Sequence, residues 1–209
     1  MGQYTQSGRF AIVVLSRYYL AMKKERASRA ATLIERVARL TSREAHADGL
    51  LPVQWEALRY LSRANRFSRT AVAVTAYLGL TKGTVSQTLK ALETKGLIRK
   101  QVDPKDRRSN RLALTAKGRR CLAGDPLAET VAALTDLSDS TGLALSRGLE
   151  EFLHKRLEAQ DRQPFGQCRE CAYFARRHPE GKPHYCRLLK EQLGKLDADA
   201  ICFEQRPRT

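Results

Sequence analysis

Four cysteines near the C-terminal end of this 209-residue chain are spaced in a way that can bind a metal. Cys168 and Cys171 form a Cys-x2-Cys pair, and Cys186 and Cys202 follow singly, after 14 and 15 intervening residues. A Cys-x2-Cys pair directs two thiolates at one metal centre, and two further thiolates complete a four-fold ligand set. The surrounding segment is polar and too small for a large hydrophobic core, so it needs an additional cross-link such as a bound metal to be stable. We expect all four thiols to be metal ligands.

The spacing leaves two metals open and favours an iron–sulfur cluster. Structural zinc sites often use two close pairs of ligands, whereas only the first pair is close here. Aromatic residues follow the cysteines at Tyr173, Phe174 and Phe203. In these features the segment resembles the small high-potential-like iron–sulfur modules in the small subunits of some glycyl-radical enzymes. That resemblance implies a single 4Fe–4S cluster, with zinc as the alternative, and adds His184 and His178 as alternate ligands.

The fifth cysteine and the N-terminus carry no comparable signal. Cys121 stands apart from the other four and is most simply a small core residue. The apolar run from Phe10 to Leu15 is too short for a membrane span, is followed by Arg17 and lacks a small-residue cleavage site. We therefore expect a soluble, cytoplasmic protein, and in that reducing compartment structural disulfides are not expected.

Positive charge is concentrated in one third of the chain. The formal net charge is +16, and residues 51–120 hold sixteen Lys and Arg against four Asp and Glu. Such a concentrated excess indicates a polyanionic partner, because attraction to phosphates supplies most non-specific affinity for nucleic acids. A membrane surface would attract the same charge, but it would be met by an amphipathic helix with a wide apolar face.

The basic region contains a helix with one apolar and one polar face. Thr81 can cap its start, and Val85, Leu89 and Leu92 recur at helical spacing on the inner face. The outer face carries side chains of the kind that reach base edges and phosphates: Lys82, Thr84, Ser86, Gln87 and Lys90. A short helix over residues 69–77 precedes it, so the two helices form a helix-turn-helix.

A basic hairpin follows this helix. Residues 97–102 and 111–115 are expected to be paired strands, and the turn-rich loop between them contains Arg107 and Arg108. A polar helix followed by a cationic hairpin is how a winged helix-turn-helix meets DNA. The two loop arginines are the best individual candidates for DNA contact.

The rest of the chain before residue 163 is expected to be helical. Helices are predicted over residues 10–24, 27–43 and 52–66, and a long helical tract with a bend near residue 139 runs to about residue 160. The fold class is therefore mainly α with a small β-hairpin wing. We expect four parts: dimerisation helices (1–48), the winged helix-turn-helix (49–122), further dimerisation helices (123–162) and the cysteine-rich metal module (163–209).

Residues 51–122 resemble the MarR family of bacterial transcription regulators. The resemblance is carried by LPVQWEAL at residues 51–58, LTKGTVSQ at 80–87, LETKGLI at 92–98, the wing DPKDRR at 103–108 and LTAKG at 114–118. It implies a symmetric homodimer whose second helices enter successive major grooves of a pseudo-palindromic operator. It places Lys82, Thr84, Ser86 and Gln87 near base edges and Lys90 on the backbone. Arg107 and Arg108 would lie in or beside the minor groove.

These features together predict a DNA-binding transcription regulator, a repressor, whose cluster senses redox state, iron or nitric oxide. Loss of the cluster would loosen a tail that supports the dimerisation helices. One alternative is a structural zinc with a small-molecule effector in the dimer cleft, and another is a non-specific architectural DNA binder. An enzyme is not expected, because the sequence has no phosphate-binding Gly-rich loop, His-Glu-x-x-His pair or nucleophile elbow.

Overall fold

A computed structural model describes residues 6–44, 49–102, 110–176 and 183–208. The chain forms two compact units, Met1–Glu44 and Ala45–Thr209. The first contains a single helix, α1 (Gln6–Glu44), where the sequence predicted two. Residues 9–44 contain neither proline nor glycine, so nothing in them ends a helix. Several of its apolar side chains are exposed, among them Leu33, Val37 and Leu40.

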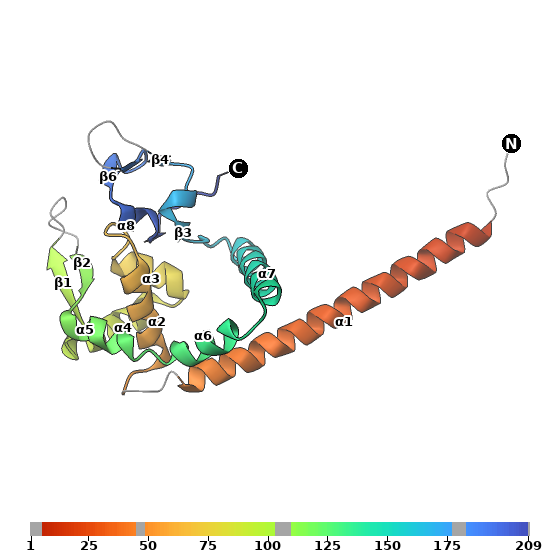
Figure 1. Cartoon of the computed structure of the whole chain (residues 1–209), viewed down its shortest axis with the longest axis horizontal. Coiled ribbons are helices and arrows are strands. Elements are labelled where there is room, and N and C mark those ends of the chain that lie inside the picture. Colours follow the sequence, from red (N-terminus) through yellow and green to blue (C-terminus); the bar gives the residue numbers. More distant parts are fainter. Residues whose placement is uncertain (1–5, 45–48, 103–109, 177–182, 209) are drawn as a thin grey trace. The chain divides into compact units, whose positions relative to one another are not determined.

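The second unit is built around a winged helix-turn-helix (Figure 1). Its elements are α2 (Pro52–Arg63), α3 (Ala71–Leu78), α4 (Lys82–Thr94), β1 (Ile98–Val102), β2 (Asn110–Leu114) and α5 (Ala116–Ala123). Strands β1 and β2 form an antiparallel hairpin in which Ile98 is opposite Leu114 and Val102 is opposite Asn110. The predicted fold class, mainly α with a small hairpin wing, is confirmed.

The core of this unit lies between the three helices and the hairpin. Trp55, Leu58 and Leu61 on α2 are at most 1 % exposed, and they pack with Val85 and Leu92 of α4. The inner face predicted for α4 is therefore the buried one. Burying an aliphatic side chain contributes roughly 1.5–3 kcal/mol, so this apolar face fixes which side of α4 meets solvent.

Two glycines meet local demands of the backbone next to α4 and the hairpin. Gly79 ends α3 at φ 66°, a left-handed conformation that glycine adopts without strain. At Gly118 a Cβ would lie 2.1 Å from the carbonyl oxygen of Leu97. Helix α5 can therefore pack against the base of the hairpin only because residue 118 has no side chain.

The helical tract after α5 is divided in two. Helix α6 (Leu127–Thr135) and helix α7 (Asp139–Glu158) are separated near the predicted bend, where the Ser138 hydroxyl accepts a hydrogen bond from the Thr141 N–H at 3.3 Å. Neither helix contains a buried residue. On α7, Leu149 and Phe152 are 45 % and 48 % exposed, so its apolar face is not covered within the described chain.

The C-terminal tail consists mainly of short strands. They are β3 (Gly166–Gln167), β4 (Phe174–Arg176), β5 (His184–Cys186), β6 (Glu191–Leu193) and β7 (Ile201–Cys202), with a 3₁₀ turn (Cys168–Glu170) and helix α8 (Lys195–Ala198). β4, β5 and β6 form one antiparallel sheet, and β3 pairs with β7. Strands of two or three residues are too short to show a period in the sequence. All helices in the described residues are too short or too polar to cross a bilayer.

An ion pair holds the end of α5 against α2. The Arg59 guanidinium group donates to both carboxylate oxygens of Asp125, at 2.6 and 2.7 Å. Partial burial acts to raise the pKa of Asp125, but the hydrogen bonds from Arg59 and from the Leu127 N–H outweigh it, and the pKa is lowered. Both side chains are less than one fifth exposed, so solvent screens the pair only partly.

We expect Asp125→Asn to reduce the free energy of unfolding at pH 7 by about 1–2 kcal/mol. A lowered folded-state pKa stabilises the protein above the unfolded pKa of about 3.9, and that stability is lost as the pH falls through the folded value. The difference between the two proteins should therefore shrink between pH 5 and pH 3 in urea unfolding experiments. An equal difference at pH 7 and pH 3 would show that the charge of Asp125 does not contribute.

Candidate nucleic-acid interface and cysteine cavity

The polar face of α4 is exposed as the sequence predicted. Lys82, Thr84, Ser86, Gln87 and Lys90 are all exposed. The Thr81 hydroxyl caps the helix by accepting from the Thr84 N–H at 3.2 Å, and the Thr84 hydroxyl lies 2.9 Å from it. The Thr84 side chain thus takes part in the cap, whereas the other four side chains extend from the helix surface.

Three of these side chains line a groove between α3, α4 and the hairpin. The groove has a volume of about 870 Å³, and its lining includes Lys82, Ser86 and Lys90. Lys100 also lines it and pairs with Glu93 at 2.7 Å. The groove is therefore cationic at Lys82 and Lys90.

The wing arginines lie outside the described residues, which end at Val102 and resume at Asn110. Val102 and Asn110 are the last register partners of the hairpin. The predicted DNA contacts of Arg107 and Arg108 stay a prediction.

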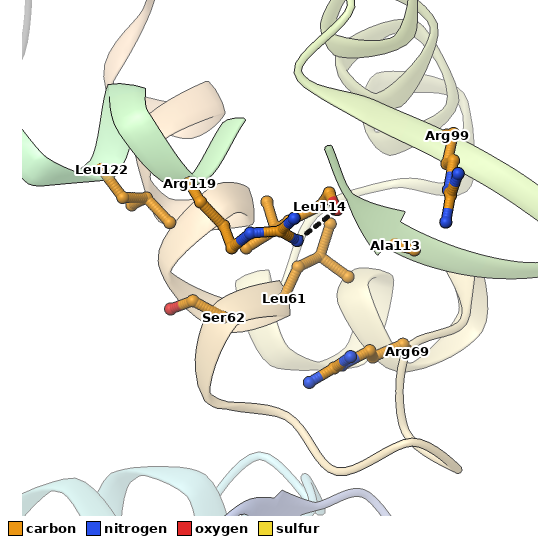
Figure 2. A pocket seen from close by; sticks show the side chains of 8 residues that line it. All are labelled: Leu61, Ser62, Arg69, Arg99, Ala113, Leu114, Arg119 and Leu122. Carbon is orange, nitrogen blue, oxygen red and sulfur yellow. Dashed lines mark hydrogen bonds between the residues drawn. The ribbon is translucent and has the colours of Figure 1, made fainter. Parts of the chain in front are cut away.

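A second cationic pocket lies at the base of the hairpin (Figure 2). It has a volume of about 310 Å³, an apolar floor that includes Leu61, and three lining arginines, Arg69, Arg99 and Arg119. Arg119 donates to the Leu114 carbonyl oxygen at 2.9 Å, the bond drawn in Figure 2. The sequence analysis missed this pocket, because its arginines come from a loop, a strand and a helix.

The structure brings the four predicted metal ligands together. The cavity that Cys168, Cys171, Cys186 and Cys202 line is also bounded by Phe174 and Leu193. Three of the cysteines are at most 6 % exposed. Thiols from the 3₁₀ turn and the residue after it, from β5 and from β7 therefore meet in one apolar environment.

Three of the four sulfur atoms accept a hydrogen bond from an N–H group. The Asn65 side-chain amide donates to Cys168 Sγ at 3.3 Å. The backbone N–H groups of Leu189 and Arg206 donate to Cys186 Sγ and Cys171 Sγ, each at 3.5 Å. Donors aimed at sulfur stabilise the thiolate form, which is the form that binds metals.

The surroundings shift the pKa values of two of these thiols in opposite directions. The hydrogen bond from Cys168 lowers the pKa of Cys202, and the same bond, together with burial, raises the pKa of Cys168. Cys202 therefore loses its proton more readily than Cys168. Four sulfurs in one cavity, three of them with N–H partners, fit a thiolate-bound metal.

The geometry of the cavity bears on which metal it fits. The cavity lined by the four cysteines has a volume of about 10 Å³, so a cluster requires the side chains to separate. Within the described residues, no three His, Cys, Asp or Glu side chains are arranged around one point as ligands of a single ion. Either metal therefore requires side-chain adjustment.

The two histidines considered as alternate ligands differ in position. His184 is on β5, two residues before Cys186, and its ring contacts Phe174 at 4.8 Å between centroids. It is not among the residues that line the cavity, and its Nδ1 is buried with no hydrogen-bond partner in the described part of the chain. His178 lies outside the described residues.

The cysteine module packs on the α2–α3 loop, residues 64–70. The Asn65 N–H donates to the Ile201 carbonyl oxygen, and the Phe203 N–H donates to Ser68 Oγ, both at 2.8 Å. Arg66 pairs with Asp197 of α8. The expectation that the tail supports the dimerisation helices has to be revised, because these contacts are with the helix-turn-helix itself. Sequence analysis missed Asn65, which carries no signal beyond a turn-forming residue between two helices.

Comparisons with known proteins agree with this geometry. Residues 48–109 match the model of the MarR family. No curated protein matches the chain significantly. The structure is similar to that of S. aureus MepR in complex with DNA, at 22 % identity and a TM-score of 0.50, over 60 % of this chain and 96 % of that one.

Two archaeal structures are similar to a comparable degree. BldR from Sulfolobus solfataricus is 24 % identical with a TM-score of 0.51, over 65 % of this chain and 97 % of that one. A MarR transcriptional regulator from Methanosarcina mazei Go1 is 23 % identical with a TM-score of 0.51, over 65 % of this chain and 99 % of that one. The solved structures thus share the winged helix-turn-helix fold of this chain, and residues 48–109 are similar to the MarR family.

Proposed function

We propose that the protein is a sequence-specific DNA-binding transcription regulator. The observation that carries this proposal is the exposed polar face of α4, where Lys82, Ser86 and Lys90 line a cationic groove beside the hairpin. A helix of this width fits the major groove, where Ser86 and Gln87 can bond base edges and the lysines can bond guanine or phosphate. The loop arginines Arg107 and Arg108 would contact the adjacent minor groove, whose negative potential attracts guanidinium groups.

The regulator would act as a homodimer. Exposed apolar side chains recur on one face of α7 at positions 145, 149, 152 and 153, a spacing that is typical of a helix with a partner. A second copy of this chain would cover that face and place two α4 helices about 34–36 Å apart. The matching operator would be a pseudo-palindrome, and occupancy of a promoter by such a dimer would repress transcription.

The four cysteines would hold the metal through which the regulator senses its signal. We favour a 4Fe–4S cluster, because two of the four ligands come singly from distant segments and because N–H donors surround the sulfurs. When bound, such a cluster supplies sensitivity to oxidants, iron supply and nitric oxide. The cysteines hold it, and Phe174 and Leu193 exclude water from it.

Zinc is the second candidate, favoured by the small volume of the cysteine cavity. A zinc ion would make the module a structural staple, and regulation would then come from a small molecule bound elsewhere. A non-specific architectural binder is a further alternative, which has a steep salt dependence without a preferred site.

Selection from a pool of randomised duplexes tests the proposal directly. We expect enrichment of two inverted half-sites whose centres are about one helical turn apart. Enrichment of no sequence, combined with salt-sensitive binding to every duplex, would indicate the architectural binder and contradict the regulator.

With the selected operator in hand, we expect Lys82→Ala to weaken binding about 5- to 30-fold, which corresponds to the 1–2 kcal/mol of a groove contact. Lys90→Ala should weaken binding to all duplexes alike and lower the salt slope by about one unit. Lys195→Ala in α8 is the matched control, since it removes the same charge from an exposed site in the tail. Fluorescence anisotropy measures all three. Equal losses for Lys82→Ala and Lys195→Ala would mean that only net charge matters.

Dimerisation is tested on α7. We expect Leu149→Glu to reduce the mass in solution from twice to once the 23.5 kDa of the chain, because a buried carboxylate without a partner is costly. Arg147→Glu, on the other side of the same helix, is the control and should leave the dimer intact. Light scattering at micromolar concentration reports the mass. A Leu149→Glu protein that remains a dimer would exclude this face.

A further inference from the structure

One buried amide connects the cysteine cavity to the DNA-reading domain. Asn65 is 2 % exposed. Its Nδ2 donates to Cys168 Sγ at 3.3 Å, and its Oδ1 accepts from the N–H groups of Phe67 at 3.0 Å and Ser68 at 2.9 Å. These partners fix the orientation of the amide, because rotation by 180° would point the oxygen at the sulfur and the NH₂ group at two N–H donors.

The loop that Asn65 shapes is bonded to strand β2 of the wing. The Leu112 N–H donates to the Arg69 carbonyl oxygen at 2.7 Å. The Arg111 guanidinium group donates to the Arg66 carbonyl oxygen at 3.2 Å and lies 5.6 Å from the centre of the Phe67 ring. The path from a cysteine sulfur to the wing therefore runs through one side chain and four loop residues, with short contacts at each step.

We propose that Asn65 couples metal ligation at Cys168 to the position of the wing. The proposal rests on the metal site described above and holds for a cluster or for zinc. A bound metal keeps Cys168 Sγ in place as an acceptor, so the Asn65 amide stays fixed and the turn at residues 65–68 is maintained. Without the metal the Cys168 side chain is held only by packing, so its hydrogen bond with the Asn65 amide is weaker and the loop is freer to move relative to β2.

Asn65 is thus a positioning residue that acts on DNA binding through the α2–α3 loop. Coupling between two sites in a protein typically changes affinity 5- to 150-fold. Asn65→Ser separates the two roles of the side chain, because a hydroxyl can still accept from the loop N–H groups and is too short to reach the sulfur.

The test compares operator affinity of metal-loaded and metal-stripped protein, for the wild type and for Asn65→Ser, with metal content measured in each sample. We expect a change of about 10-fold or more in the wild type and less than about 2-fold in Asn65→Ser at equal metal content. The cluster absorption spectrum or reduction potential should also shift in the variant, because an N–H donor to one sulfur has been removed. Arg187→Gln, an exposed change within the module, should behave as the wild type.

Each outcome has a distinct meaning. Equal metal-dependent changes in the wild type and in Asn65→Ser would overturn the role of Asn65 and leave metal sensing in place. A wild type that binds metal without any change in affinity would overturn both the coupling and the sensor, and leave DNA binding untouched.

A second measurement needs no variant, so it applies even if Asn65→Ser fails to fold or to load. Hydrogen exchange of the wild type should show faster exchange in residues 65–69 and 111–114 after metal removal. Unchanged exchange in these two segments, with faster exchange in residues 168–202, would overturn the proposal.

Discussion

The hydrogen bonds of the Asn65 amide are the constraint on which the arrangement of this domain depends. They shape the α2–α3 loop, and this loop is where the two hydrophobic clusters of the second unit meet. Ile201 from the tail is part of the helical core, and Phe67 from the loop packs against the cysteine cluster. Because each cluster contains a residue of the other segment, the cysteine module and the helix-turn-helix stabilise each other.

This arrangement places an exposed polar helix face and a buried group of cysteines in the same unit of the chain. Helix α4 buries Val85, Leu89 and Leu92 and thereby exposes its polar side to solvent, where a polyanion can bind. The cysteines, in contrast, lie in an apolar environment where N–H groups donate hydrogen bonds to three of the sulfurs. The loop between α2 and α3 contacts both, so a change at the sulfurs has a short physical path to the surface that would meet DNA. A dimer would repeat the path in each subunit.

Local patterns made part of this structure predictable. Helical spacing of apolar residues, a capping threonine and a turn-rich basic loop identified α4 and the hairpin, and cysteine spacing identified the four thiols that meet in one cavity. Two helices were predicted where α1 is continuous. Residues 9–44 contain no proline or glycine that would end a helix, and this absence should have favoured a single helix. The short strands of the tail, the three-arginine pocket and the bond between Asn65 and Cys168 could not be predicted. That bond joins residues 103 positions apart, and no local propensity encodes such a contact.

The central claim is that the cysteine cavity holds an iron–sulfur cluster. Anaerobic purification followed by an absorption spectrum and by iron, sulfide and zinc analysis of the same sample tests it most directly. If the cavity holds a 4Fe–4S cluster, we expect a brown protein that absorbs at about 400 nm and contains about four irons and four sulfides per chain. A colourless protein with about one zinc per chain would contradict the cluster and make the module a structural staple, and a protein without metal would contradict the site itself.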